Sequence, residues 1–481
     1  MNRFLTPYLF VLIGLASGIA ASPPNIVLIV SDDHGTDALG CYGNPVVQTP
    51  ALDTLAADGT LFTDANCTTA SCSPSRSVIL SGLHNHRNGQ YGLEHSFHHF
   101  QSFDSMTSLP VILSENGYHT ARIGKYHIAP ESVYKFETVL SAGAANDPKT
   151  IGRSPWKMAE QSRPIIESDD ERPFFLYYAT DDPHRANAFT ADGLPTFDTY
   201  PLPNKFGNRD ERYPGINPVV YDPEDVIVPS FLPDTAASRA EIAEYYQSVS
   251  RMDEGIGHLI DILKAAGQYD NTVIIYLSDN GIAFAGAKTT LYEPGMKLPL
   301  IVREPGQQKT GRTQSAMISW VDIVPTLLDY AQIDVSGVET HGRSFRTGVS
   351  KTLEDWNEVY ASHTFHETTM YYPMRVLKER RYKLIFNIAY GLEFPLAKDL
   401  LQSPTWVSMQ KEGLELYGRR TPEALLHRDR IELYDLKVDP DETINLAADP
   451  AHQKTRDRMI AKLQGFQNET KDPWAIKWTR E

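Results

Sequence analysis

The sequence predicts an α/β fold in which a large, mostly parallel sheet is flanked by helices and a smaller C-terminal subdomain combines an antiparallel sheet with a helix. Three continuous apolar runs, rich in β-branched or aromatic residues, indicate buried parallel strands at Asn25–Val30, Pro173–Tyr178 and Thr272–Leu277. Ser238–Lys264, between the second and third runs, has apolar residues at helical spacing. Strands that alternate with helices are typical of a parallel sheet covered by helices.

The C-terminal part of the chain has a different pattern. Short strand-like runs at Tyr382–Phe386 and Glu432–Leu436 predict a small antiparallel sheet, and a helix is expected over about Ala451–Glu469. A length of 481 residues fits two unequal domains. We therefore expect an α/β catalytic domain over residues 22–355 and an α+β subdomain over residues 356–481.

The N-terminus has the features of a signal peptide over residues 1–21. Arg3 supplies the positive charge and Tyr8–Ile19 the apolar core, and cleavage is expected near Ala20 or Ala21, among the small residues Gly18, Ala20, Ala21 and Ser22. The apolar run is shorter than a membrane span, and no later stretch is long and apolar enough to be one. We expect an exported protein, which is periplasmic or extracellular, or lysosomal if the source is a eukaryote.

The charge balance argues against two classes of partner. Lys and Arg total 45 and Asp and Glu total 61, so the formal net charge is −16. Nucleic acid and acidic membrane surfaces are therefore not expected as main partners, whereas binding of an anionic substrate depends on local charge. The sequence leaves open whether the chain forms a homodimer. It also leaves open whether Cys41 and Cys67 form a disulfide or stay separate thiols.

Polar side chains follow two of the predicted strands at the point where each strand ends. Asp32 and Asp33 come directly after the first run, and Asp279 and Asn280 follow the third. Open α/β sheets place their sites at the carboxyl ends of the strands, so these side chains are expected to converge. Three carboxylates and one amide oxygen are hard ligands. They suit Ca²⁺, with Mg²⁺ as the second choice, rather than zinc.

Cys72 opens the run Cys-Ser-Pro-Ser-Arg, which ends at Arg76 and leads into a predicted helix over Ser75–Leu83. Proline suits the first helical turn because its missing N–H would have no partner there. Cys72 therefore lies at a helix N-terminus, where backbone N–H groups and the helix dipole favour an anion. Arg76 adds a planar and permanently charged fork. Taken alone, a cysteine before a helix is more often an ordinary buried residue.

The run Cys72–Arg76 resembles the Cys-x-Pro-Ser-Arg signature of the sulfatase family, which depends on formylglycine and belongs to the alkaline phosphatase superfamily. The resemblance implies an alkaline phosphatase-like fold and a formylglycine-generating maturation enzyme that oxidises Cys72. In the family the hydrated aldehyde is the nucleophile. Loss of the proton from its second hydroxyl expels sulfate, which divides one hard step into two easier ones. The formylglycine oxygen also completes the calcium shell, so Cys72 joins the metal set.

Four further positions match residues that act on the sulfate in this family. The resemblance implies that Lys125 contacts the sulfate, and that His127 contacts the formylglycine hydroxyl and helps to expel sulfate. His184 would be the acid that protonates the leaving group. Lys288 would be the last sulfate-binding cation, and with Arg76, Lys125 and the metal it would neutralise charge on the transferring sulfuryl group.

Longer stretches resemble one branch of the family, the sulfamidases, and include Leu93–Phe100, Phe174–Arg185 and His363–Arg375. This branch cleaves N–S rather than O–S, at the amine of a terminal glucosamine in heparan sulfate or heparin. Lys288 departs from it, because an arginine is expected there. Selection of N–S must come from the rim of the pocket, for which the candidate substrate-binding residues are Glu94, His98, Asp182, Arg185, His366, Glu367 and Arg375.

Three other functions remain open from the sequence. An exo-acting O-sulfatase on another sulfated polysaccharide, such as a carrageenan-type galactan, would keep the scaffold and exchange the rim. A phosphatase or phosphodiesterase of the same superfamily would use Ser or Thr with two metals, and Cys72 counts against it. A non-catalytic glycan-binding protein is disfavoured because nucleophile, cations and metal ligands are all present.

Overall fold

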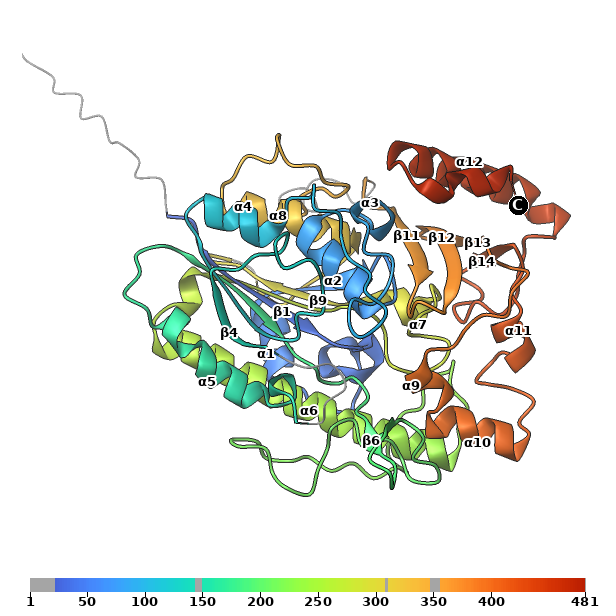
Figure 1. Ribbon diagram of the computed structural model, residues 1–481, viewed down its shortest axis with the longest axis horizontal. Helices are drawn as coiled ribbons and strands as arrows, with labels where there is room; N and C mark the ends of the chain where they lie inside the picture. The colour runs from blue at the N-terminus through green and yellow to red at the C-terminus, as the bar shows by residue number, and fades with distance from the viewer. Residues whose placement is uncertain (1–21, 143–148, 308–309, 347–354, 481) are drawn as a thin grey trace, which may run out of the picture.

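A computed structural model describes residues 22–142, 149–307, 310–346 and 355–480, and the predicted signal peptide lies outside them. Its centre is an eight-stranded sheet with the order β10-β2-β9-β8-β1-β5-β3-β4 (Figure 1). Only β9 runs antiparallel to its neighbours, so the predicted mostly parallel sheet is confirmed. The strands are β1 Asn25–Ser31, β2 Thr60–Asn66, β3 His119–Gly124, β4 Thr138–Ala142, β5 Phe174–Ala179, β8 Thr272–Ser278, β9 Lys297–Arg303 and β10 Arg312–Ser319.

The three apolar runs found in the sequence form the middle of this sheet, because β1 lies between β8 and β5. Side chains alternate across a strand, and β1 shows the consequence. Ile26, Leu28 and Val30 belong to the core on one face, and Val27 and Ile29 to the core on the other. Every residue of β1 is buried, as expected for a strand covered on both sides.

Helices cover both faces of the sheet (Figure 1). The long α6, which spans Ala236–Ala265, packs beside α5 and α1 on one face. On the other face α2 packs against α4 and α8. The helices of the larger part are α1 Pro50–Asp58, α2 Cys72–Ser81, α3 Asn85–Asn88, α4 Leu109–Glu115, α5 Pro155–Ile166, α6 Ala236–Ala265, α7 Glu293–Met296 and α8 Ile323–Tyr330.

Helix α2 begins three residues earlier than predicted, at Cys72 instead of Ser75, and ends at Ser81 instead of Leu83. Pro74 is tolerated because the first turn needs no N–H from it. Gly82 ends the helix in a left-handed conformation with φ of 69°, which glycine adopts without steric cost. Cys72 is therefore the first residue of the helix itself.

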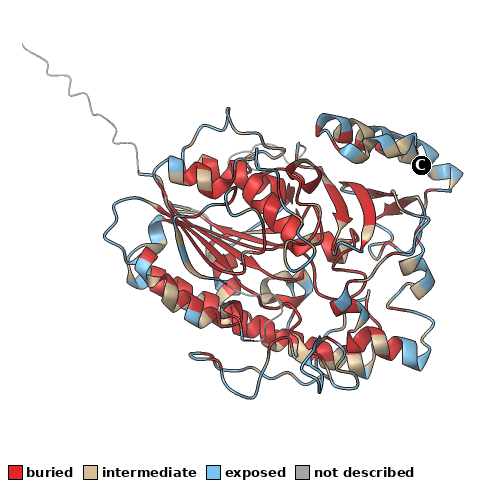
Figure 2. Ribbon diagram, in the orientation of Figure 1, coloured by how far each residue is buried: buried red, intermediate tan, exposed pale blue. Residues whose placement is uncertain are grey.

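The C-terminal part contains an antiparallel four-stranded sheet in the order β11-β12-β13-β14, as the sequence predicts. Helix α12 covers this sheet and packs apolar side chains against it, whereas its outer face is exposed (Figure 2). The sheet begins at Glu358, and the domain boundary at residue 356 stays a prediction. Its elements are β11 Glu358–Phe365, β12 Tyr371–Glu379, β13 Tyr382–Asn387, α9 Lys398–Leu401, α10 Pro404–Glu412, α11 Pro422–Leu426, β14 Ile431–Asp435 and α12 Gln453–Glu469.

The segment between β5 and α6 is largely irregular and carries only the two-residue strands β6 Ala188–Phe189 and β7 Pro195–Thr196.

The structure has no disulfide between Cys41 and Cys67. Both are free thiols, which is the second of the two alternatives that the sequence left open. Nowhere in the described ranges does a helix combine the length and hydrophobicity needed to cross a membrane. Short 3₁₀ helices occur at Thr36–Ala38, Gly40–Tyr42, Ile151–Arg153, Tyr269–Asn271, Trp320–Asp322, Pro450–His452 and Pro473–Trp478.

Buried histidines join helix α12 to the larger part. His86 stacks on His84 with ring centroids 5.4 Å apart, and Phe466 of α12 meets both rings edge-on. His86 Nδ1 lies 3.0 Å from Ser362 Oγ and Nε2 lies 2.9 Å from Thr470 Oγ1. Burial lowers the pKa of His86 from 6.5 to about 3, so the ring is neutral in the folded protein at neutral pH.

Acid should therefore weaken the folded state at this junction. The unfolded chain takes up a proton at His86 below pH 6.5, whereas the folded chain resists it until about pH 3. The contribution of the neutral His86 ring to the free energy of unfolding is thus complete above pH 6.5 and is lost as the pH falls below that value. The loss at pH 5 is about 2 kcal/mol for this residue. Urea unfolding at pH 7 and pH 5 should show a shallower pH dependence for His86→Gln than for the wild type. His427→Gln, at an exposed position, is the control; equal pH dependence in all three proteins would contradict the prediction.

Candidate active site

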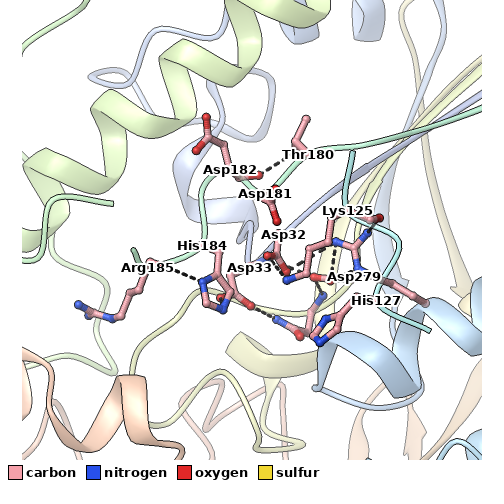
Figure 3. Close-up of polar contacts among 12 residues, drawn as sticks. Asp32, Asp33, Lys125, His127, Thr180, Asp181, Asp182, His184, Arg185 and Asp279 are labelled. Carbon is pink, nitrogen blue, oxygen red and sulfur yellow. Dashed lines mark hydrogen bonds and ion pairs between the residues drawn. The ribbon is translucent and has the colours of Figure 1, made fainter. Parts of the chain in front are cut away.

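Four of the predicted ligands meet at the carboxyl ends of β1 and β8. Asp32 and Asp33 follow β1, Asp279 follows β8, and Cys72 reaches the same point from the start of α2. One ligand atom from each of these residues lies within 4.8 Å of all the others. Asp33 has a positive φ of 63°, which places it in a turn where its carboxylate can converge with that of Asp32. Figure 3 shows Asp32, Asp33 and Asp279 of this cluster close to one another.

The cluster fits a divalent cation. Asp32 Oδ1 and Asn280 Oδ1 are fully buried and make no hydrogen bond with any residue that the structure describes, and Arg76 Nη2 is 3.6 Å from the former. Burial raises the pKa of Asp33 to about 6 and that of Asp279 to about 7, although Lys288 and Arg76 oppose the shifts. Buried carboxylates with raised pKa values and unpaired oxygens lack positive charge. An oxygen-binding ion such as Ca²⁺ would supply it.

Each predicted sulfate-binding cation is paired with a different carboxylate of the cluster. Lys125 Nζ donates to Asp32, Arg76 Nε donates to Asp279 Oδ2 at 2.8 Å, and Lys288 Nζ donates to Asp33 Oδ2 at 3.0 Å. Both lysines and the arginine are at most 2% exposed. The predicted cations are therefore brought to the centre, but they are held there by its acidic groups.

His184 presents one ring nitrogen to the centre. Its Nδ1 lies 2.6 Å from the carbonyl oxygen of Arg185, which can only accept, so Nδ1 carries the hydrogen. Nε2 lies 2.9 Å from Lys288 Nζ and 3.5 Å from Asp33 Oδ2, and it is also close to Cys72. Nε2 therefore accepts from the Lys288 ammonium and carries no hydrogen in the neutral ring. In the predicted role of an acid, His184 must first gain a proton at Nε2, for which Lys288 is the adjacent donor.

His127 is also at the site and has a partner that the sequence did not indicate. Its backbone has φ of 57°, and its Nε2 lies 2.5 Å from Nδ1 of His95. Nδ1 of His127 is buried and has no hydrogen-bond partner in the described part of the chain. His95 belongs to the stretch Leu93–Phe100, but no motif distinguishes it from the other histidines there.

Four of the seven rim candidates lie together beside Cys72. The ring of His366 is 2.8 Å from the hydroxyl of Ser71, the residue before Cys72. The backbone carbonyl of His366 accepts a hydrogen bond from the N–H of Leu93. This contact brings the half-buried Glu94 and His98 to the same side of the site. His98 Nδ1 in turn accepts from the N–H of Thr368, which follows Glu367.

The other three rim candidates are not brought to the cluster, because buried ion pairs occupy their charges. Asp182 accepts from Arg153 and Arg251, Arg185 pairs with Glu241, and Arg375 donates to Asp472 at 2.5 and 2.9 Å. Asp182, Arg185 and Arg375 are all fully buried. In Figure 3 the charged ends of Asp182 and Arg185 point away from the centre.

One acidic residue at the centre was missed. Asp399 lies on α9, and its Oδ2 accepts from Lys288 Nζ at 2.9 Å and lies 3.9 Å from His184 Nε2. It is 5% exposed. No pattern in the sequence indicated it, because its neighbours form no recognisable motif and it comes from the C-terminal part.

The local charge also favours a bound cation. Four carboxylates, those of Asp32, Asp33, Asp279 and Asp399, face Arg76, Lys125 and Lys288. The formal charge is therefore −1 without a divalent ion and +1 with it, and only the second attracts an anionic substrate. A cavity of about 520 Å³ lies between the two parts, but none of these residues lines it. The candidate site is therefore identified by its charged and metal-binding side chains and not by the presence of this cavity.

Family models and individual relatives all indicate the same protein family. A family model described as Sulfatase matches residues 24–333, and one described as N-sulphoglucosamine sulphohydrolase, C-terminal, matches residues 286–407. Human N-sulphoglucosamine sulphohydrolase is 38% identical over 469 residues, covering 94% of this chain and 92% of its own. The N-acetylglucosamine-6-O-sulfatase of Bacteroides thetaiotaomicron is 28% identical, covering 93% of this chain and 87% of its own.

A solved structure shows the same fold. This structure contains a protein in complex with its substrate D-glucosamine-2-N,6-O-disulfate. The protein superposes on this chain with a TM-score of 0.66, covering 96% of this chain and 100% of its own. At 21% identity, this likeness concerns the fold alone.

Calcium should stabilise the folded protein through the acidic cluster. At about 100 times its dissociation constant, a ligand that binds only the folded state adds about 2.7 kcal/mol. The thermal unfolding midpoint should therefore rise on addition of CaCl₂ to chelator-treated protein. The rise should shrink between pH 7 and pH 5 as protons compete at Asp33 and Asp279. Asp279→Asn should abolish the rise and the exposed control Asp192→Asn should retain it; a calcium response kept in Asp279→Asn would refute the site.

Proposed function

Because the chain belongs to the sulfatase family, we propose that this sulfatase removes the N-sulfate from N-sulfoglucosamine at the non-reducing end of heparan sulfate or heparin. The observation that carries the proposal is the 38% identity to human N-sulphoglucosamine sulphohydrolase over nearly the whole of both chains. The match includes the region from Lys288 to Asp399, which the second family model also covers. That region supplies a cation, an acid and His366 to the site.

The cofactors of the proposed reaction are a formylglycine at Cys72 and a calcium ion. Asp32, Asp33, Asp279 and Asn280 would hold the ion, and Cys72, once oxidised, would face it. Together they would supply a nucleophilic oxygen and positive charge next to the sulfate. The unpaired oxygens of Asp32 and Asn280 support this assignment. A formylglycine-generating enzyme is the partner that the modification requires.

The cationic side chains would bind and orient the sulfate. Lys125, Lys288 and Arg76 surround the carboxylate cluster and are buried, so their charges are poorly screened by water. When an ion takes over the carboxylates, the lysine ammonium groups can turn toward the sulfate oxygens. Pre-placed charges of this kind act most strongly on the charge that develops in the transition state.

His184 would deliver the proton that the leaving nitrogen needs. An amine departs as a neutral molecule only if a proton reaches its nitrogen as the N–S bond breaks. The hydrogen bond from Nδ1 to the carbonyl of Arg185 fixes the ring so that Nε2 faces the centre. Burial and Lys288 lower the pKa of His184, and a bound sulfate anion would offset the effect of Lys288.

His127 would handle the proton at the modified Cys72 side chain. Its Nε2 is held by His95, so Nδ1 is the nitrogen that can exchange a proton with a neighbouring hydroxyl. We also propose that residues 1–21 direct export, in keeping with the basic and then apolar order of that segment.

A substrate panel tests the proposed specificity. Matured protein should release sulfate from N-sulfoglucosamine at least about 100-fold faster than from 6-O-sulfated glucosamine or a sulfated galactan, and no phosphate from a phosphate ester. Cys72→Ala should be inactive on every substrate, whereas Cys41→Ala should match the wild type. Sulfate release from the galactan without release from N-sulfoglucosamine would make the protein an exo-O-sulfatase.

The role of His184 can be separated from a general loss of structure. His184→Ala should lower kcat for N-sulfoglucosamine by about 10²–10⁴, the range expected for lost acid catalysis. For an aryl sulfate, whose phenolate can leave without being protonated, kcat should fall much less. Steady-state kinetics on both substrates measure the difference. An equal loss on both would show that His184 is not the acid.

A further inference from the structure

Asp399 is held rigidly beside the proposed acid and one proposed sulfate-binding cation. Helix α9, which carries it, contributes Ala397 and Leu400 to a small buried cluster with Ala283 and Met370. Asp399 lies between these two apolar anchors in the sequence, so its backbone is fixed from both sides. Its carboxylate is therefore a permanent feature of the site wall and not a mobile surface group.

The two carboxylate oxygens of Asp399 have different surroundings. Oδ2 accepts from Lys288 Nζ at 2.9 Å and lies 3.9 Å from His184 Nε2. Oδ1 accepts no hydrogen bond from any side chain or backbone group in the described ranges, although the residue is 5% exposed. An ionised carboxylate has acceptor capacity on both oxygens, so Asp399 can accept a further hydrogen.

A leaving group at His184 would lie within reach of Asp399 Oδ2, which keeps a second lone pair beside the hydrogen bond from Lys288. The atom that receives the proton must come within about 3 Å of His184 Nε2. Nε2 is 3.9 Å from Asp399 Oδ2, and Lys288 Nζ lies 2.9 Å from both atoms. When the Lys288 ammonium turns to the sulfate, the leaving atom can contact both residues at once. The hydrogen-bonding character of the leaving atom then decides whether this contact is favourable.

The leaving atom is nitrogen in a sulfamate and oxygen in a sulfate ester, and the two differ in whether they can donate a hydrogen bond. The nitrogen of a sulfamate carries one hydrogen and can donate it to a carboxylate, whereas the bridging oxygen of a sulfate ester has none and meets the carboxylate as a second acceptor. A site whose polar group finds its partner in one substrate and not in the other discriminates strongly between them.

We propose that Asp399 is a specificity-determining residue that accepts the N–H of the scissile sulfamate and so selects N-sulfate over O-sulfate. The inference rests on the proposed function. As the N–S bond breaks, its electron pair stays on nitrogen, which takes its new proton from His184 Nε2. Asp399 accepts only the hydrogen that nitrogen already carries and gains no proton. The product amine can then remain hydrogen-bonded to this carboxylate as it becomes an ammonium group.

The interaction of Asp399 with Lys288 requires a test that separates two roles. A residue that merely positions Lys288 would affect all sulfated substrates alike, because Lys288 is proposed to bind the sulfate and not the leaving group. The informative quantity is therefore the ratio of kcat/KM for two substrates that differ only at the bridging atom. N-sulfoglucosamine and glucose 2-O-sulfate are such a pair.

Asp399→Asn should lower the ratio of kcat/KM for N-sulfoglucosamine over glucose 2-O-sulfate at least about tenfold, because one lost charged acceptor costs that much. Glu393→Gln, at an exposed position just before α9, is the matched control and should keep the wild-type ratio. An unchanged ratio with an equal loss on both substrates would overturn the proposal and leave Asp399 as an anchor for Lys288. Wild-type protein that is inactive on N-sulfoglucosamine but active on O-sulfates would instead refute the proposed function.

Product inhibition of the wild type gives a second measurement that does not depend on the folding of a variant. Glucosamine should inhibit at a concentration at least about tenfold lower than glucose, because its ammonium group makes a charge-assisted hydrogen bond with Asp399. The preference should disappear in Asp399→Asn. Equal inhibition by the two sugars in the wild type would also overturn the proposal.

Discussion

The crowding of four buried carboxylates at one edge of the sheet is the constraint on which the rest of the site depends. Parallel strands β1 and β8 end side by side, so the acidic residues that follow them must meet. Buried like charges repel, and each carboxylate here is stabilised by a cationic side chain drawn from another element. The cations that the reaction would need are thus already required by the fold.

The second consequence concerns the origin of these cations and acids. Arg76 comes from α2, Lys125 from the end of β3, and Lys288 from the loop after β8, while Asp399 arrives from α9 in the C-terminal part. A site assembled in this way is fixed by packing on several sides. It also means that the two parts of the chain share one charge balance, so neither part contains the complete site.

The sequence predicted the sheet, and it also predicted which residues meet at the strand ends, because both depend on local patterns. Apolar strands ending in Asp32 and Asp279 carry their own signal, and so does the run from Cys72 to Arg76. The rim was predicted less well. Asp182, Arg185 and Arg375 are charged residues in matching stretches, but each is used in a buried ion pair whose partner is distant in sequence. His95 and Asp399 were missed for the converse reason, since only long-range contacts bring them to the centre.

If Cys72 is oxidised as proposed, the burial of helix α2 sets an order of events during biosynthesis. Every residue from Cys72 to Ser81 is inaccessible to solvent once the sheet and its flanking helices have closed around them. A second protein can therefore act on the thiol only while the nascent polypeptide is still open. Chains that collapse before that encounter are trapped as well-folded but inert molecules. On this proposal the yield of functional protein would depend on the relative rates of folding and oxidation, and inert folded protein would have to be unfolded before the thiol could be oxidised.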